Sequence, residues 1–381
     1  MSPATSPNNR ACPLLLMHGG GGTEPVEQNL GRVKRAILRT HVERAALLPS
    51  IDRIIAAVDD PEFARELSEL SVETVLTDTA PFHFGETLRF LIHRFKLERL
   101  LYVGAGALPL AGPEELETLA TCVAGSHRVL ATNNLFSSDC VGFSPAEALM
   151  TFPPPESDNR LAYLLHESGL PLAEVPRSLG LIFDVDTPID AVILAMHPEA
   201  PVGARAAASS LRCLLPVSEA RQALLDPGLE VFVYGRAGSL LLSVLDKDAA
   251  SRIRFFSEER GMKAQGRVQS GSVTTILGSL LSRFDFKEFF SLLGGVVHAA
   301  FLDTRPLFAS AGIAVSARDR YLSDLGQHSE ITDSYVRALT RAALEASIPV
   351  VLGGHSLVSG GLWALLDSGW RARDGGCDAD H

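Results

Sequence analysis

The sequence alternates short apolar runs with longer amphipathic stretches, and this alternation constrains the fold more than any other feature. Between the first two apolar runs, residues 30–48 place apolar side chains at helical spacing. A strand–helix–strand order of this kind is typical of βαβ units around a mostly parallel sheet. The strand-like runs of the first half are residues 14–17, 53–58, 73–76, 99–103, 128–132 and 181–183.

The second half contains the same mixture of elements. Residues 230–234, 296–302 and 349–352 read as strands, and residues 239–245 and 335–346 read as helices. Between the halves, Pro198, Pro201 and Gly203 interrupt two apolar segments. We therefore expect an α/β protein of two domains. Residues 1–198 should form a Rossmann-like, mostly parallel sheet domain, and residues 199–381 a second, mixed α/β domain.

Length and composition narrow the class of protein. A chain of 381 residues exceeds the usual size of one domain. The net charge of −11, without a basic stripe, argues against a nucleic-acid partner. No run approaches the roughly 20 apolar residues that span a bilayer. The five cysteines are far apart and form no C-x-x-C pair, which favours a reducing compartment. We expect a cytoplasmic protein that binds no membrane.

A glycine-rich loop follows the first strand-like run and precedes the first helix. It consists of Gly19, Gly20, Gly21 and Gly22. Backbone N–H groups in such a loop can approach a phosphate, because no Cβ stands in the way. A flexible connector would have the same composition, so the loop alone does not identify a phosphate site.

Three segments that follow this loop resemble segments of a known family and occur in the same order. Residues 31–38 contain Lys34 at the start of a helix, and residues 84–88 read Phe-Gly-Glu-Thr-Leu. Residues 184–190 read Asp-Val-Asp-Thr-Pro-Ile-Asp. Over residues 14–196 the chain resembles the GT-A-like nucleotidyltransferases of the molybdenum-cofactor (MobA-like) and phospholactate (CofC-like) type, whose domain ends in a similar D-[IV]-D-T-P-E-D signature.

The resemblance implies a reaction and a set of site residues. An acceptor phosphate or hydroxyl would attack the α-phosphorus of a nucleoside triphosphate, with a small molecule as the acceptor. Lys34 and Asp186 would be the catalytic residues. Lys34 would contact phosphates, and Asp186 would hold magnesium, which prefers carboxylate oxygens. The loop glycines would cradle the phosphates, with Gly85 and Glu86 near the base. Alternatively, Asp184 and Asp186 only cap the following helix.

Two departures from the family pattern put activity in question. Ala107 stands where the family places a metal-binding aspartate on its central strand, and Thr23-Glu24-Pro25 replaces an expected arginine. One interpretation is a nucleotidyltransferase with a degenerate metal site. The other is a catalytically inactive nucleotide-binding or assembly module, whose C-terminal domain binds or acts on a phosphorylated metabolite.

Gly- and Ser-rich turns in the second half suggest an anion site. The turns at residues 235–239 and 353–356 each follow a strand-like run and open a helix, where N–H groups and the helix dipole favour negative charge. Ordinary helix caps, and arginines paired with acids such as Asp303, would explain the same pattern. The predicted second-domain anion site consists of Arg236, Ser239, Arg305, His355 and Ser356.

Overall fold

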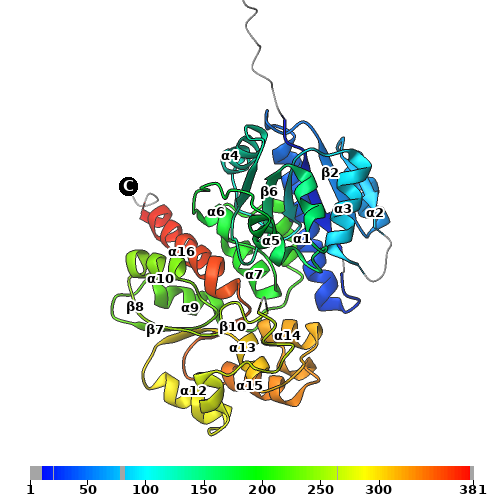
Figure 1. Cartoon of the computed structure of the whole chain (residues 1–381). Helices are drawn as coiled ribbons and strands as arrows, with labels where there is room; N and C mark the ends of the chain where they lie inside the picture. Colours follow the sequence, from blue (N-terminus) through cyan, green and yellow to red (C-terminus); the bar gives the residue numbers. More distant parts are fainter. Residues whose placement is uncertain (1–10, 20, 78–81, 264, 378–381) are drawn as a thin grey trace, which may run out of the picture. The chain divides into compact units, whose positions relative to one another are not determined.

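The computed structural model describes residues 11–19, 21–77, 82–263 and 265–377 (Figure 1). By internal contacts the chain divides into two compact units. The first comprises Met1–Gly20 and Ile37–Ile182, and the second comprises Gly21–Ala36 and Phe183–His381. The border expected at residue 198 falls inside the second unit, between α7 (Pro188–Met196) and α8 (Val202–Ala208). Among the described residues, no helix has both the length and the apolar character of a membrane span.

The first unit contains a six-stranded sheet in the order β3-β2-β1-β4-β6-β5. All neighbouring strands are parallel except β6, which runs antiparallel to β4 and β5. The mostly parallel α/β sheet expected for this part of the chain is confirmed. Its strands are β1 (Leu14–His18), β2 (Ile54–Val58), β3 (Glu73–Leu76), β4 (Leu100–Gly104), β5 (Val129–Thr132) and β6 (Cys140–Ser144).

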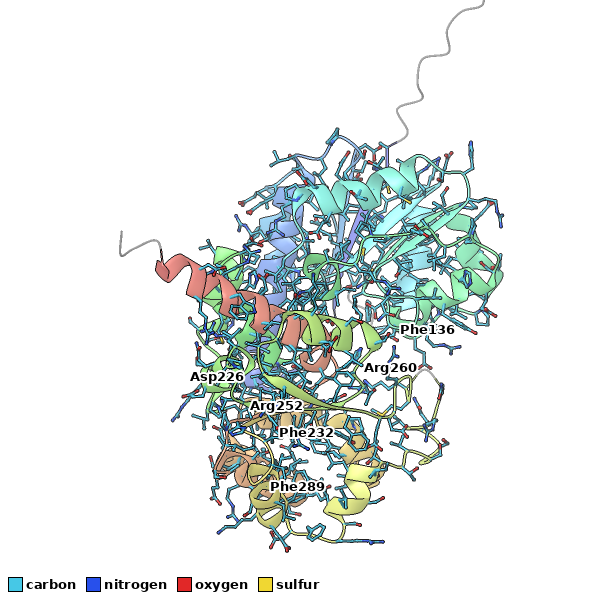
Figure 2. The ribbon with its side chains drawn as sticks, turned by 90° about the vertical axis from the view of Figure 1, so that its left-hand side faces the viewer. Phe136, Asp226, Phe232, Arg252, Arg260 and Phe289 are labelled. Atoms are coloured by element: carbon cyan, nitrogen blue, oxygen red, sulfur yellow. The ribbon has the colours of Figure 1, made fainter. Side chains whose placement is uncertain are left out.

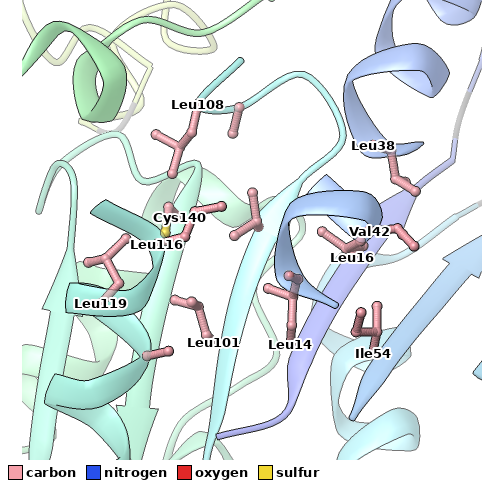
Figure 3. Close-up of a cluster of buried hydrophobic side chains, with 14 of the residues drawn as sticks. Leu14, Leu16, Leu38, Val42, Ile54, Leu101, Leu108, Leu116, Leu119 and Cys140 are labelled. Atoms are coloured by element: carbon pink, nitrogen blue, oxygen red, sulfur yellow. The ribbon is translucent and has the colours of Figure 1, made fainter. Parts of the chain in front are cut away.

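Helices cover both faces of this sheet, because successive side chains of a buried strand point to opposite faces. Leu14 and Leu16 of β1 belong to one apolar cluster, which Figure 3 shows, and Leu15 and Met17 belong to another. Helices α1 (Pro25–Ala45), α2 (Pro61–Ser68) and α4 (Pro113–Ala124) contribute to the first cluster. Helices α3 (Phe84–Phe95) and α5 (Leu161–Glu167) contribute to the second.

The second unit contains a four-stranded sheet in the order β10-β9-β7-β8, with every pair parallel. Helices α9, α10 and α16 lie on one side of it and α12, α14 and α15 on the other (Figure 1). The strands are β7 (Glu230–Gly235), β8 (Arg252–Ser257), β9 (Ala299–Asp303) and β10 (Val350–Gly353). The remaining helices are α9 (Val217–Leu224), α10 (Ser239–Asp248), α11 (Ile276–Leu281), α12 (Phe286–Gly294), α13 (Arg305–Ser310), α14 (Ala317–Asp324), α15 (Ser334–Leu344) and α16 (Leu362–Cys377).

Three parts of the sequence interpretation differ from the structure. Residues 181–183, expected as a strand, lie at the end of the short helix α6 (Leu179–Ile182). Strand β6 was missed because Gly142 breaks its apolar pattern; a Cβ there would lie 2.4 Å from Cγ2 of Val123. Strand β8 was missed because it is an edge strand that carries two arginines. Both pair with Glu230 of β7, Arg252 at 3.1 Å and Arg254 at 2.6 Å.

The buried His41 makes the fold sensitive to acid. Its Nε2 donates to the carbonyl oxygen of Ala107 at 2.8 Å, and burial lowers the pKa of the ring to about 4. The unfolded chain therefore takes up a proton below about pH 6.5 that the folded chain binds only near pH 4, so stability falls as the pH drops through this interval.

We expect His41→Gln, which keeps a donor for Ala107, to flatten this dependence. The measurement is the free energy of unfolding in urea from pH 7 to pH 4. The wild-type slope should exceed the variant slope by about 1.4 kcal/mol per pH unit. His93→Gln, at an exposed position on α3, is the control and should keep the wild-type slope. Equal slopes for the wild type and His41→Gln would contradict this account.

Candidate functional site

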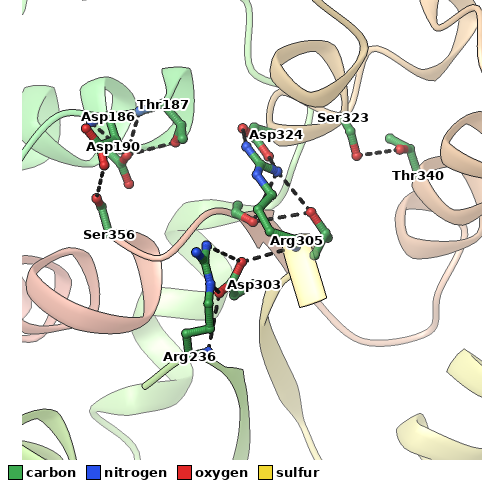
Figure 4. Close-up of polar contacts among 12 residues, drawn as sticks. Asp186, Thr187, Asp190, Arg236, Asp303, Arg305, Ser323, Asp324, Thr340 and Ser356 are labelled. Carbon is green, nitrogen blue, oxygen red and sulfur yellow. Dashed lines mark hydrogen bonds and ion pairs between the residues drawn. The ribbon is translucent and has the colours of Figure 1, made fainter. Parts of the chain in front are cut away.

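Charged side chains gather in the second unit where the parallel strands end. We call Asp184, Asp186, Arg236, Asp303, Arg305, Asp324, His355 and Ser356 the strand-end network; Figure 4 shows most of its contacts. Ligands of parallel α/β sheets bind at the carboxyl ends of the strands. The network therefore lies where the fold favours a ligand.

Asp303, the last residue of β9, holds the ends of two strands together. Its fully buried carboxylate accepts hydrogen bonds from Nε of Arg236 at 2.6 Å, Nη2 of Arg236 at 3.2 Å and the backbone N of Arg305 at 3.1 Å. Gly235 is required beside it, because its φ is 136° and a Cβ would lie 2.3 Å from Cβ of Asp303. Burial raises the pKa of Asp303, but the charge and hydrogen bond of Arg236, together with the nearby Arg305 and His355, hold it below its usual range.

Arg305 forms a two-point ion pair with a second buried acid, Asp324. Its Nη1 and Nη2 donate to the two carboxylate oxygens of Asp324 at 2.7 and 2.6 Å, and Nη1 also donates to Oγ1 of Thr304 at 2.9 Å. Burial lowers the pKa of Arg305, but the charge and hydrogen bonds of Asp324, together with the nearby Asp303, hold the pKa above its ordinary value. Both arginines of the predicted anion site thus pair with acids, as the alternative interpretation held, and Arg305 has an evident structural role.

The turn after β10 meets the aspartate pair of the Asp-Val-Asp-Thr-Pro segment. The buried Ser356 Oγ lies 3.0 Å from Oδ2 of Asp184 and 3.4 Å from Oδ2 of Asp186, and it donates to these carboxylates. Asp184 is buried, whereas Asp186 reaches solvent. The serine therefore fixes a carboxylate pair with one member open to a ligand.

Lys34 stabilises the charged form of Asp186. The dense protein around Asp186 raises its pKa, although the side chain itself reaches solvent. The Lys34 charge, with smaller contributions from neighbouring groups such as His355 and Lys263, opposes this effect, and the pKa lies below its usual value. Lys34 is half-buried, and within the described part of the chain no hydrogen bond or ion pair engages its ammonium group. Lys34 and Asp186, both predicted to be catalytic, are therefore close enough to interact.

Helix α7 is capped by neighbours of the aspartate pair, not by the pair itself. Oδ2 of Asp190 accepts from the backbone N and the Oγ1 of Thr187, each at 2.8 Å, and Thr187 is the N-cap residue. The side chains of Asp184 and Asp186 take no part in this capping box. The interpretation that they serve only as caps does not match the structure.

His355 and Ser239 complete the list of residues predicted for the second domain. His355 is half-buried, and in the described residues its Nδ1 has no hydrogen-bond partner. Burial and the positive charge of Arg236 lower its pKa to about 4, so the ring is neutral near pH 7. Ser239 is the first residue of α10, where its carbonyl oxygen accepts from Oγ of Ser243 at 3.0 Å.

The predicted nucleotide-binding glycines divide between the units. Gly19 is exposed in the first unit, next to Phe82, and Gly20 lies outside the described residues. Gly21 and Gly22 belong to the second unit. A Cβ at Gly21 would meet no atom within 4 Å, whereas a Cβ at Gly22 would lie 1.8 Å from Oε2 of Glu27. Gly21 is therefore open to a ligand, whereas a side chain at Gly22 would need the Glu27 carboxylate to move.

Gly85 and Glu86, at the start of α3 in the first unit, have different surroundings. The Gly85 N–H donates to the carbonyl oxygen of Pro155 at 2.9 Å, and a Cβ at Gly85 would lie 2.6 Å from the Pro155 nitrogen. Close packing on Pro155 thus accounts for this glycine. Glu86 is exposed, and its backbone N–H donates to the capping ring of His83. Contact of these two residues with a base stays a prediction.

Asp184 and Asp186 fit a magnesium ion that binds together with substrate phosphates. They do not form a complete site for a permanently bound ion. Ala107 is 3% exposed and packs in the apolar core, so nothing there replaces the missing aspartate. Across the described residues, no three His, Cys, Asp or Glu side chains converge to hold a metal. Asp184 and Asp186 provide two carboxylates. Magnesium typically uses one or two carboxylates together with water and substrate phosphates, so this pair fits it.

Sequence reasoning missed three cations near the network. Arg260 and Lys263 follow β8, the strand that was also missed, and Arg320 lies on α14. A correct reading of β8 would have placed Arg260 and Lys263 after a strand end. No sequence signal marks Arg320, because its proximity to Arg305 is a result of tertiary packing.

Comparisons with solved structures find partial likenesses, and the two described here each cover less than half of this chain. No protein-family model matches the sequence, and no curated protein is significantly similar. The CMP:2-keto-3-deoxy-manno-octonic acid synthetase complexed with CTP is 11% identical, with 42% of this chain and 88% of that chain covered and a TM-score of 0.31. A nucleotidyl transferase from Methanothermobacter thermautotroptrophicus is 14% identical, with 46% and 92% covered and a TM-score of 0.36.

We expect Arg305 to act on stability, because its loss leaves Asp324 buried without a counter-charge. Arg305→Met should cost about 3–5 kcal/mol of unfolding free energy, and the double variant Arg305→Met/Asp324→Leu should recover most of it. Urea unfolding measures both. Arg341→Met, which removes an exposed pair with Glu345, should cost under about 1 kcal/mol. A similarly small cost for Arg305→Met would show that the buried pair is not structural.

Proposed function

We propose that this chain is a nucleotidyltransferase-like protein that transfers a nucleoside monophosphate from a nucleoside triphosphate to a small phosphorylated or hydroxylated acceptor. In this proposal Lys34 and Asp186 are the catalytic residues.

The observation that carries the proposal is the proximity of Lys34 and Asp186. The two residues lie far apart in the sequence, in two segments that carry the same family resemblance. Both residues belong to the second unit, and the Lys34 charge lowers the pKa of the Asp186 carboxyl. A lysine beside an exposed carboxylate matches the needs of triphosphate chemistry, where catalysis consists mostly of positioning and charge neutralisation.

Each residue of this centre has a physical role in the proposal. Lys34 neutralises phosphate charge, and Asp184 and Ser356 orient the Asp186 carboxylate. Glu24, which could repel a triphosphate, is paired with Arg318 at 3.1 Å. Asp186, with Asp184 beside it, would hold magnesium, which would neutralise negative charge on the phosphates. Because Ala107 removes a ligand, cation binding without a nucleotide should be weak.

A second candidate function is a nucleotide-binding module without turnover. The burial of Ala107 in the apolar core favours it, because a site with one metal ligand fewer stabilises the transition state less well. In that case the second unit would bind or act on a phosphorylated metabolite. The two candidates differ in one measurable property, the release of pyrophosphate.

Pyrophosphate release therefore tests the proposal. The full chain is incubated with each nucleoside triphosphate, magnesium and a panel of small phosphorylated and hydroxylated acceptors. Acceptor-dependent release supports transfer. Thermal stabilisation by a nucleotide without release supports the binding module, because a ligand that binds only the folded state raises its stability. If the protein shows no pyrophosphate release and no thermal stabilisation by any nucleotide, both functions are contradicted.

We expect Lys34→Gln to weaken nucleotide binding with little loss of stability. A charge-assisted phosphate contact contributes roughly 1.5–3 kcal/mol, so the Kd should rise at least about 10-fold. Isothermal titration gives the Kd, and thermal unfolding gives the stability. Lys247→Gln, at a position 82% exposed on α10, is the control and should leave both unchanged. A lower melting temperature with an unchanged Kd would make Lys34 a structural residue.

A further inference from the structure

The strand order of the second sheet defines a place for a ligand. Strand β8 lies on one side of β7, whereas β9 and β10 lie on the other, and all four strands are parallel. The connections that leave β7 and β9 therefore diverge to opposite sides of the sheet. Ligands of such sheets bind in the crevice outside the carboxyl ends at this switch point. Arg236 follows β7 here, and Thr304 follows β9.

The acids at the switch point are already neutralised by other partners. Asp303 is paired with Arg236 at 2.6 Å and Asp324 with Arg305 at 2.6 Å. The acids that follow β8 are engaged elsewhere: Glu259 pairs with Arg267 at 2.6 Å, and Glu258 accepts from the backbone N of Ile276 at 2.7 Å. Asp186 is the remaining acid that acts on Lys263.

Three cations lie around the switch point without a comparable partner. Within the described residues, no side-chain hydrogen bond or ion pair engages Arg260, Lys263 or Arg320. Nε of Arg320 is also shielded from water and has no partner there. Burial lowers the pKa of Arg320, and the nearby Arg305 charge lowers it further. The dense protein around Lys263, although its side chain reaches solvent, and the charges of Arg236 and Arg320 likewise lower the pKa of Lys263. Lys263 and Arg320 thus each lie in the positive field of neighbouring cations.

The N-terminus of α10 adds a fourth source of positive potential. Gly238 is its N-cap residue and provides no side-chain cap. A Cβ built on Gly238 would lie 3.4 Å from Nη2 of Arg260, a residue labelled in Figure 2. A guanidinium group beside the positive end of a helix is unfavourable unless an anion lies between them. The arrangement is thus complementary to a compact anion.

We propose that the switch point of the second sheet binds a phosphate dianion, free or as the terminal group of a small monoester, through Arg260, Lys263 and Arg320. Two guanidinium groups can each offer a planar fork to tetrahedral phosphate oxygens, and a lysine adds a point charge. Arg236 stays fixed on Asp303 and adds positive potential. This inference goes beyond the proposed function, and it does not require that a nucleotide bind.

The test is isothermal titration of the full chain with inorganic phosphate and with glycerol phosphate, without nucleotide or magnesium and at constant ionic strength. The variants are Arg260→Gln, Lys263→Gln and Arg320→Gln. Each should raise the phosphate Kd about 10-fold, because each removes one charge-assisted contact. Arg341→Gln, an exposed arginine on α15, is the charge-matched control and should keep the wild-type Kd.

The outcomes show whether the site exists and whether it prefers free phosphate or a phosphate monoester. Tighter binding of glycerol phosphate would assign the site to a phosphorylated metabolite, and tighter binding of inorganic phosphate would assign it to the free anion; both support the proposal. Absence of saturable binding would overturn it. Binding that survives Arg260→Gln and Lys263→Gln but is lost in Lys34→Gln would overturn it as well. Arg260 and Lys263 are exposed, so those variants should fold even if Arg320→Gln does not.

Discussion

The buried carboxylate of Asp303 is the constraint on which the organisation of the second unit depends. A fully buried charge is costly unless it is paired and hydrogen-bonded, and Arg236 together with the Arg305 N–H meets this need. Meeting it draws the ends of β7 and β9 together and requires a glycine at Gly235. The same pairing fixes the Arg236 guanidinium at the switch point of the sheet. One buried acid therefore determines both the backbone path and part of the electrostatic field there.

The buried and partly buried aspartates of the second unit occur in two kinds of pair, which differ in how available their oxygens are to a ligand. In the first kind, which we call closed, a buried aspartate forms an ion pair with an arginine. Asp303 with Arg236 and Asp324 with Arg305 are of this kind, and they hold strand ends and helices in place. Asp184 and Asp186 are instead joined through Ser356, with Asp186 reaching solvent and Lys34 supplying the opposing charge. A closed pair resists ligands, because its hydrogen-bonding capacity is used. An open pair keeps oxygens available for a cation or a donor, which is why we place the chemistry there.

The metal site illustrates how a family resemblance and a structure complement each other. The resemblance showed that Ala107 stands where the family has an aspartate. The structure places Ala107 in the apolar core, and its carbonyl oxygen accepts a hydrogen bond from His41. A carboxylate at this position would lie in the apolar core, where burial of a charge is costly, so the side chain at this position serves packing. In the proposed function, a cation would therefore depend on Asp184, Asp186 and the ligand's own oxygens.

The sequence by itself determined the α/β class, most strands and both catalytic candidates, because hydrophobic period and local motifs are encoded over a few residues. It did not reveal β6 or β8, since Gly142 and the arginines of β8 are explained only by contacts with Val123 and Glu230. The partners of Arg236 and Arg305, and the gathering of Arg260, Lys263 and Arg320, were likewise decided by tertiary structure. Pairing between residues far apart in the chain depends on strand order and helix packing, and a single sequence carries no local signal for either.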